Sequence, residues 1–274
     1  MPVRRLHIRP GAIGDVILSL PALLAAKAQE VWTPTALVSV LQLAGFSKIR
    51  PIPTTGLDLV GVRGGAELCP ALRDFDEIIS WYGANNDAFR TAVRDLPFQF
   101  LDALPPKDST VNAADFFLHQ IQAPIGGNPS LAIESSRANY AVIHPFSGSA
   151  QKNWPLSRYK ELAASLDLEV RWVAGPEQHL DSATLFEDLA DLAGFLAAAR
   201  IYVGNDSGIT HLAAATGTPT VAIFGPTDPR VWAPRGAHVR VVKPPNRASM
   251  PDAGLEDVGL EKVLQVVRSL LSLH

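Results

Sequence analysis

Short apolar runs and helical stretches alternate along the first half of the chain. The apolar runs are typical of strands, and the stretches between them have helical spacing. The predicted strands are 3–9, 35–40, 77–81 and 98–101, and the predicted helices are 15–30, 84–95 and 112–122. Pro21 lies inside the first helix and either kinks it or restarts it after Ser19. This alternation favours a parallel sheet covered by helices.

The same alternation resumes after residues 123–139, which are rich in Gly, Pro, Ser and Asn. The predicted strands are 140–146, 169–175, 201–204, 220–225 and 238–242, and the predicted helices are 155–166, 184–199 and 207–216. A final amphipathic helix is predicted from apolar residues at close to helical spacing, which are Val258, Val263, Val266, Val267 and Leu270.

The change of composition near the middle predicts a flexible interdomain linker. We therefore expect two Rossmann-like α/β domains, 1–128 and 140–274, joined by the linker 129–139, with parallel sheets facing a cleft. The final helix can pack back on the first domain. Ligands of open α/β sheets bind beyond the carboxyl ends of the strands, so the chemistry is expected in the loops that follow strands.

Charge and cysteine content narrow the class of protein. The net charge is −3 and neither half is strongly basic, so nothing favours a nucleic-acid partner. Cys69 is the only cysteine, which excludes an internal disulfide and fits a reducing compartment. The N-terminus resembles a signal peptide, but Asp15 and Pro21 interrupt its apolar stretch. We expect a cytoplasmic protein with at most peripheral membrane contact.

The first loop of interest is "RPGAIGD", residues 9–15. It matches neither the Gly-x-Gly-x-x-Gly dinucleotide pattern nor a P-loop. Gly11 and Gly14, on either side of Ala12, allow close backbone approach. Asp15 then stands at the start of a predicted helix, either as a capping residue or as a general base on an open loop.

The second loop is "HPFSGSAQKNWP", residues 144–155. Ser147, Gly148 and Ser149 can donate backbone and hydroxyl hydrogen bonds to an anion, and Lys152 adds a positive charge. The alternative is an ordinary solvated lysine ahead of a helix.

The third loop is "GNDSGITH", residues 204–211, where a strand turns into a helix. Asp206 can cap the helix, and the backbone N–H groups at its start favour an anion such as a diphosphate. The residues expected to contribute are Ser207, Gly208, Ile209 and Thr210. His211 follows as either a packed core histidine or a functional one, and Thr227 and Asp228 come after the next strand as turn formers or pocket residues.

Other signals for metal or hydrolase chemistry are weak. "DFD" (74–76) precedes a strand instead of ending one, so we interpret it as a surface turn and not as a metal-binding Asp-x-Asp. The histidines lack metal-ligand spacing, and no Gly-x-Ser-x-Gly elbow occurs. We therefore expect no metal and no other cofactor.

Together the loops resemble glycosyltransferase family 9, the bacterial ADP-heptose:lipopolysaccharide heptosyltransferase group. The resemblance is carried by "GAIGDVILSLPAL", "HPFSGSAQKNWPLSRYKELA", "AGPEQH" and "VGNDSGITHLAAATGTPTVAIFGPTDP". It implies a GT-B fold of two Rossmann-like domains, the N-terminal one for the acceptor and the C-terminal one for the nucleotide-sugar. It also implies a metal-independent, inverting sugar transfer on the cytoplasmic side of the membrane, with ADP-heptose as donor and a glycan or lipid-linked acceptor.

The same resemblance implies roles for individual residues. Asp15 would take the proton from the acceptor hydroxyl, and Lys152 would meet the donor phosphates. Asp206 would contact the sugar of the donor, and Ser207 and Gly208 would donate to the diphosphate. The remaining residues would support or border the pocket, and they are His211, Thr227 and Asp228.

Two other functions stay open. An epimerase or hydrolase on the same scaffold would process the nucleotide-sugar without an acceptor. A non-catalytic paralogue would only bind it, although such a module has no need of Asp15. The first half also lacks a Lys/Arg cluster that would bind a phosphorylated acceptor, so the residues do not identify the acceptor. They do not identify the sugar or the nucleobase of the donor either.

Overall fold

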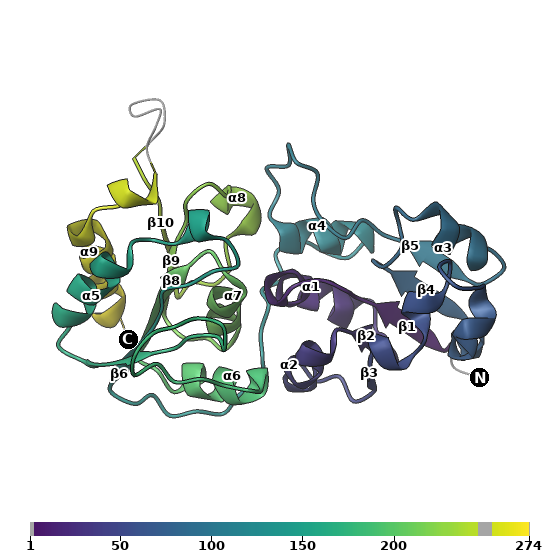
Figure 1. The fold of residues 1–274 in the computed structure, drawn as a ribbon, viewed down its shortest axis with the longest axis horizontal. Coiled ribbons are helices and arrows are strands. Elements are labelled where there is room, and N and C mark those ends of the chain that lie inside the picture. Colours follow the sequence, from purple (N-terminus) through teal and green to yellow (C-terminus); the bar gives the residue numbers. More distant parts are fainter. Residues whose placement is uncertain (1–2, 246–253, 274) are drawn as a thin grey trace. The chain divides into compact units, whose positions relative to one another are not determined.

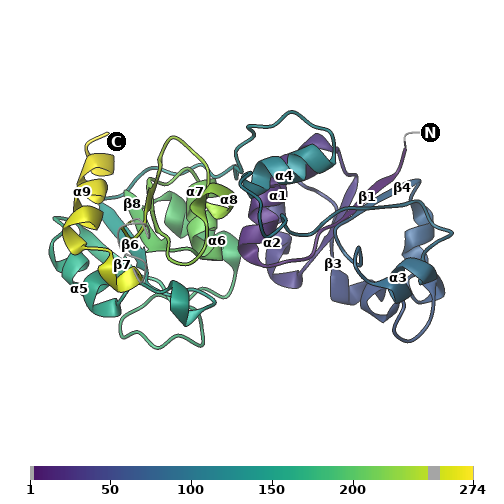
Figure 2. The ribbon, with the colours of Figure 1, turned by 90° about the horizontal axis from the view of Figure 1, so that it is seen from above.

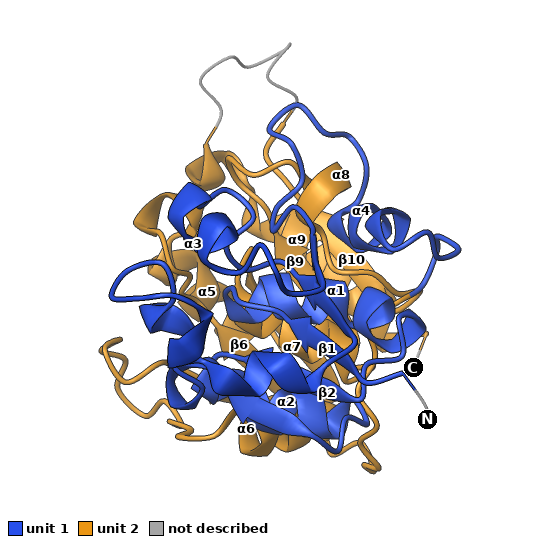
Figure 3. Cartoon of the chain, turned by 90° about the vertical axis from the view of Figure 1, so that its right-hand side faces the viewer, with its two compact units in different colours: residues 1–127 blue, residues 128–274 orange. Residues whose placement is uncertain are grey.

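The computed structural model describes residues 3–245 and 254–273. The chain forms two compact units, Met1–Gly127 and Asn128–His274 (Figure 3). Each unit contains one five-stranded sheet in which every strand pairing is parallel, with helices packed around it (Figure 1). Both halves are therefore Rossmann-like α/β folds, as the alternation of strands and helices predicted.

Unit 1 carries the first sheet. Its strands lie in the order β3 (Ile49–Pro51), β2 (Glu30–Thr33), β1 (Arg5–Ile8), β4 (Glu77–Ser80) and β5 (Phe98–Phe100). Its α-helices are α1 (Ile13–Ala25), α2 (Val38–Leu43), α3 (Asp87–Ala92) and α4 (Ala113–Gln120). Helices α1 and α4 pack side by side (Figures 1 and 2). On the other face of the sheet, Leu6, Ile8 and Ile78 share an apolar core with Phe89 of α3.

Unit 2 carries the second sheet. Its strands lie in the order β10 (Val239–Val242), β9 (Thr220–Ile223), β8 (Ile201–Asn205), β6 (Tyr140–His144) and β7 (Glu169–Trp172). Its α-helices are α5 (Leu156–Ala164), α6 (Leu189–Ala197), α7 (Gly208–Ala215), α8 (Pro229–Trp232) and α9 (Leu260–Leu271). Strands β6, β8 and β9 are buried along their whole length, which explains their nearly continuous apolar sequences.

The two faces of the second sheet are covered by different helices. Ile143 and Val203 point into a core shared with α5 and α9, which includes Tyr159 and Val263. From the other face, Tyr140 donates a hydrogen bond to the Phe195 carbonyl of α6. Successive side chains of a strand thus point to opposite faces of the sheet, toward α5 and α9 on one face and toward α6 on the other.

Three sequence-based predictions about the elements were wrong. Residues 35–40 form a 3₁₀ turn and the start of α2 instead of a strand, because the buried side chains are Leu37, Val40 and Leu41, which have helical spacing. The predicted helix 15–30 ends at Ala25, and Glu30 already begins β2. Helix α6 begins only at Leu189, after Asp188 as its N-cap.

The segment 129–139 is not a flexible linker, since it is bound to unit 2. Leu131 is buried, and its N–H donates to the Ala215 carbonyl (2.9 Å). The Arg137 guanidinium donates to the carbonyls of Ala199 (3.1 Å) and Gly217 (2.8 Å). Buried apolar side chains and satisfied backbone groups fix a chain whatever its Gly and Pro content.

The C-terminal helix α9 packs within unit 2. Its buried residues Val263, Leu264, Val267 and Leu270 all join the core of the second sheet. The apolar face of α9 is thereby buried within its own unit. Among the described residues, no helix combines the length and the hydrophobicity needed to cross a bilayer.

Candidate functional site

The second and third loops meet at the carboxyl edge of the sheet in unit 2. Strands β6 and β8 are neighbours, with Ile143 opposite Val203, so the loops that follow them lie side by side. Lys152, at the end of a short 3₁₀ turn, donates from Nζ to Oδ2 of Asp206 at 2.8 Å. The Asp206 side chain is 7% exposed and that of Lys152 33% exposed. The pair is therefore anchored in the protein and open to solvent on the lysine side.

The start of α7 presents backbone donors beside this ion pair. Ser207 is the N-cap, and its hydroxyl accepts from the Thr210 N–H (3.4 Å). Gly208 and Ile209 are the first two residues of α7, so the helix contains no carbonyl group four residues before them that could accept from their N–H groups. Both residues are partly exposed. Such N–H groups and the helix dipole favour an anion.

Thr210 and His211 do not belong to that set of backbone donors. Thr210 is fully buried, its N–H also donates to the Ser207 carbonyl (3.1 Å), and its hydroxyl bonds to the Asn205 carbonyl. His211 is 5% exposed, and its N–H donates to the same Ser207 carbonyl (3.3 Å). Both residues support the loop from beneath, which corrects the expectation that the Thr210 N–H donates to a ligand.

Asn205, which sequence reasoning passed over, joins the two loops. Its Oδ1 accepts from the Trp154 N–H (2.9 Å) and from the Tyr159 hydroxyl (2.8 Å), and its Nδ2 donates to the Pro145 carbonyl (2.8 Å). The side chain is fully buried. One amide therefore fixes the loop that carries Lys152 against the loop that carries Asp206. A polar residue at the end of an apolar strand was the signal that could have revealed it.

A layer of tyrosines supports the loops from inside the unit. The Tyr202 hydroxyl lies 3.0 Å from Thr210 Oγ1 beneath the start of α7. Burial raises the pKa of Tyr202 and of Tyr159 well above the ordinary value of a phenol, so both stay neutral hydrogen-bonding groups. A Cβ at Gly204 would come within 2.3 Å of the Tyr202 hydroxyl, so only glycine fits there.

The small residues after β6 serve their own turn. The Ser147 hydroxyl donates to the Ser149 carbonyl (2.8 Å) and accepts from the Ser149 N–H (3.3 Å). Gly148 is exposed, and a Cβ would fit there without contact. Below the turn, burial lowers the pKa of His144 to about 4, so this histidine is neutral at pH 7.

The loop after β9 borders the site. Asp228 caps α8 by accepting from the Arg230 N–H (2.9 Å), and its pairing with the Arg230 side chain lowers the pKa of the Asp228 carboxyl. Thr227 is partly exposed next to it. A hollow of about 290 Å³ separates this loop from the Lys152 loop, lined among others by Gln151, Asn153, Gly225 and Glu256.

In unit 1, Asp15 lies in the first turn of α1. The N-cap is Ala12, three residues earlier, and Asp15 Oδ2 accepts the Ala12 N–H (3.0 Å). Gly11 has a φ of 126°, which a residue with a side chain rarely adopts. Asp15 is therefore a capping residue of α1, yet it is partly exposed and keeps an oxygen, Oδ1, that no hydrogen bond occupies in the described structure.

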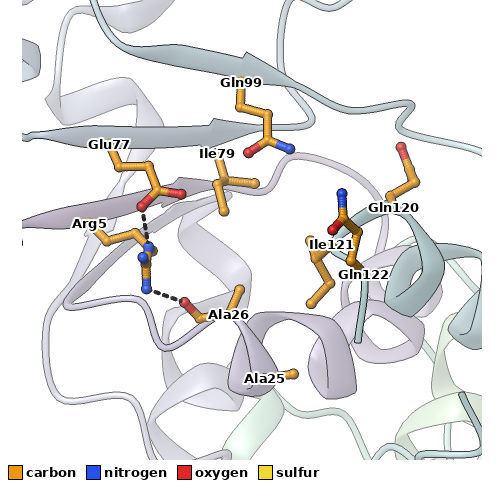
Figure 4. Close-up of a pocket in the computed structure, with 9 residues that line it drawn as sticks. All are labelled: Arg5, Ala25, Ala26, Glu77, Ile79, Gln99, Gln120, Ile121 and Gln122. Atoms are coloured by element: carbon orange, nitrogen blue, oxygen red, sulfur yellow. Dashed lines mark hydrogen bonds and ion pairs between the residues drawn. The ribbon is translucent and has the colours of Figure 1, made fainter. Parts of the chain in front are cut away.

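A second hollow, of about 320 Å³, lies in unit 1 (Figure 4), and Asp15 is not among the residues that line it. Arg5 and Glu77 line it at the amino ends of β1 and β4, where their side chains pair at 2.7 Å. The Gln120 amide is bonded to the backbone of Asp102 (2.6 and 3.1 Å). The charged groups that line this hollow, Arg5 and Glu77, are thus paired with each other. They lie at the amino ends of the strands, whereas Asp15 follows the carboxyl end of β1.

No group of three or more His, Cys, Asp or Glu side chains suited to hold a metal ion occurs among the described residues. Asp74 and Asp76 of the "DFD" segment precede β4, and Asp76 Oδ2 accepts the Arg4 N–H (2.8 Å). The segment is a surface connection, as expected.

Comparison with known proteins gives a consistent result. The sequence profile described as glycosyltransferase family 9 (heptosyltransferase) matches residues 94–258. Lipopolysaccharide heptosyltransferase 1 of Pseudomonas aeruginosa is 34% identical over 114 residues, which span 36% of this chain and only 32% of that protein. The match thus spans about a third of the relative's length.

Solved structures extend the likeness of fold to nearly the whole chain. A structure of Escherichia coli ADP-heptose lipopolysaccharide heptosyltransferase II superposes with a TM-score of 0.76 at 18% identity and covers 98% of this chain and 99% of that one. The E. coli heptosyltransferase WaaC with ADP gives 0.70 at 18%, covering 97% and 99%. The two-sheet α/β architecture is accordingly that of the GT-B fold. Since the family profile covers more than half of the chain, the protein belongs to glycosyltransferase family 9 (heptosyltransferase).

Proposed function

We propose that this protein transfers a sugar, heptose first among the candidates, from a nucleoside-diphosphate donor to a lipopolysaccharide-type or other glycan acceptor. The observation that carries the proposal is the Lys152–Asp206 pair (2.8 Å) beside the start of α7. A partly exposed cation lies at the same edge of the sheet as the N–H groups of Gly208 and Ile209, which have no hydrogen-bond acceptor within the part of the chain that the structure describes. A structural neighbour was solved with ADP, which makes ADP-heptose the donor to test first.

On the donor side, the diphosphate binds the N–H groups of Gly208 and Ile209 and the ammonium of Lys152. These donors stabilise the negative charge that grows on the diphosphate as the bond to the anomeric carbon breaks, so they replace the role of a metal ion. The Asp206 carboxylate is negatively charged, as the phosphates are, so it does not bind them although it lies beside their site. It holds Lys152 in place and can accept hydrogen bonds from sugar hydroxyls.

On the acceptor side, Asp15 is the base. Its carboxylate takes the proton of the acceptor hydroxyl, and the hydroxyl oxygen attacks the anomeric carbon. The bond from that carbon to the diphosphate oxygen breaks, the nucleoside diphosphate leaves with the electron pair, and the configuration inverts. A positioned base contributes about 10²–10⁴-fold in rate. We place the enzyme at the cytoplasmic face of the membrane, where a lipid-linked acceptor and a soluble donor both occur.

The test is calorimetry with ADP, UDP, GDP and ADP-heptose, each with and without EDTA. We expect micromolar binding of one nucleoside diphosphate that EDTA does not change. Strict dependence on Mg²⁺ would rule out the metal-independent mechanism. Release of ADP from ADP-heptose without any acceptor would indicate a hydrolase, and binding without turnover on any glycan would indicate a non-catalytic paralogue.

A further inference from the structure

Arg9, at the end of β1, is a buried cation without an acidic ion-pair partner among the described residues. Only 1% of the surface of Arg9 is exposed to solvent. Burial lowers the pKa of Arg9 to about 10, while the Asp15 carboxylate opposes that shift, so the guanidinium stays charged at neutral pH. A buried charge is costly, and a protein keeps one only where its hydrogen bonds are satisfied.

The guanidinium satisfies its donors on one side of α1. Nη2 donates to the carbonyl of Asp15 (2.9 Å), and Nε donates to Oγ of Ser19 (2.9 Å). The Ser19 hydroxyl in turn donates to the Val16 carbonyl (2.7 Å). Arg9 thus bonds to the first two turns of the helix at two positions, Asp15 and Ser19.

The same side chain is fixed by its surroundings in unit 1. Its guanidinium lies over the ring of Phe117 of α4 (4.6 Å to the centroid) and near that of Trp81 after β4 (5.6 Å). Nη1 makes a longer bond to the Ala103 carbonyl (3.4 Å). The planar group therefore locks α1 to α4 and to the loops that follow β4 and β5.

From these contacts we infer that Arg9 is a positioning residue for Asp15, an inference that rests on the proposed function. The N-cap Ala12 makes no side-chain hydrogen bond that could hold the turn, and the Asp15 carboxylate accepts a hydrogen bond from within the same turn, from the Ala12 N–H. Arg9 therefore adds polar contacts that tie this turn to the rest of unit 1, beside the apolar packing of Val16 and Ile17 that follow it on α1. The planar guanidinium donates to two acceptors in fixed directions while its face lies against a ring, whereas the ammonium of a lysine has no flat face to place there.

The test compares Arg9→Met and Arg9→Lys with Leu23→Ala, a variant that removes a fully buried side chain from the same helix. The assay uses ADP-heptose with lipopolysaccharide that lacks heptose, and measures kcat, KM, the melting temperature and the Kd of ADP. A displacement of about 1 Å of a catalytic group costs up to roughly 10²-fold in rate. We expect kcat of Arg9→Met to fall by about 10–100-fold and Arg9→Lys to fall in between. The Kd of ADP should stay within about twofold, because the donor residues lie in unit 2.

Two outcomes overturn the inference. One is a kcat for Arg9→Met equal to that of Leu23→Ala at a temperature where both are folded. The other is a crystal structure of Arg9→Met in which the Asp15 carboxylate has not moved, and this readout needs no acceptor. If Arg9→Met does not fold, Arg9→Lys and Ser19→Ala carry the same comparison. Asp15→Asn is measured in parallel, since full transfer by that variant would contradict the proposed function instead of the role of Arg9.

Discussion

At the scale of single residues, the candidate donor site depends on the partly exposed ammonium of Lys152, which the buried carboxylate of Asp206 holds in place. Lys152 is the cation that we propose to meet the diphosphate, and its ion pair with Asp206 determines where that charge stands. Replacing Lys152 with Ala removes a charged hydrogen bond worth about 1.5–3 kcal/mol, so the Kd of ADP should rise roughly 10–100-fold. Calorimetry checks this, with Lys160→Ala, an exposed lysine on α5, as the control. An unchanged Kd would make Lys152 an ordinary solvated lysine.

A second residue-scale prediction concerns the amide that joins the two loops. In Asn205→Leu, the Trp154 N–H, the Tyr159 hydroxyl and the Pro145 carbonyl lose their partner inside the protein. Unsatisfied buried groups cost about 1–3 kcal/mol each, so we expect the free energy of unfolding to fall by about 3 kcal/mol or more. Urea denaturation measures this, with the exposed Asn139→Ala as control. A loss below that of the control would mean that the loops hold together without Asn205.

At the scale of elements, each sheet carries a buried neutral histidine on an inner strand, His7 on β1 and His144 on β6. Burial lowers the pKa of His7 to about 3 and that of His144 to about 4, from 6.5 in the unfolded chain. The unfolded state therefore binds more protons below pH 6.5, and the stability that these groups provide above that pH is lost as the pH falls. At 1.36 kcal/mol per unit, His144 alone removes about 3 kcal/mol between pH 6.5 and 4.

The measurement is the free energy of unfolding from pH 7 to pH 4 for the protein and for His144→Gln. The variant should lose less stability over this range, because it has no imidazole to protonate. His179→Gln serves as the control, since His179 lies on a partly exposed loop. If the free energy of unfolding changed equally with pH in all three proteins, the assignment of His144 as a buried neutral group would be contradicted.

The elements also show where sequence reasoning works. Strands β6, β8 and β9 could be predicted because both faces are buried, and the apolar run marks them directly. Residues 35–40 could not, since Val and Thr favour strands while tertiary packing buried Leu37, Val40 and Leu41 at helical spacing. For the candidate site, motifs predicted the loops with Lys152 and Asp206, whose side chains the structure brings together, and the loop with Asp15, whose role stays a prediction. Asn205 and Arg9 were missed because much of their role consists of contacts with residues far away in the sequence, such as Trp154 for Asn205 and Phe117 for Arg9.

At the scale of the whole molecule, the chain is built from two units that each bury a core of their own. The candidate donor residues Lys152, Asp206 and Gly208 all belong to Asn128–His274. Helix α9 completes the core of that unit, so the second half has what an independent domain needs. In the function that we propose, acceptor recognition falls to unit 1, which contains Asp15 and Arg9.

This division predicts that residues 128–274 fold alone and bind ADP with a Kd within about fivefold of that of the full chain, because interactions within one domain are largely independent of distant ones. A fragment of residues 140–274, cut where the sequence suggested a domain start, should be less stable. It lacks the buried Leu131 and the Arg137 bonds to Ala199 and Gly217, and burying one leucine contributes about 2 kcal/mol. Urea denaturation of the two fragments decides the question. Equal stabilities would restore 129–139 as a free linker, and loss of ADP binding in the longer fragment would show that unit 1 takes part in holding the donor.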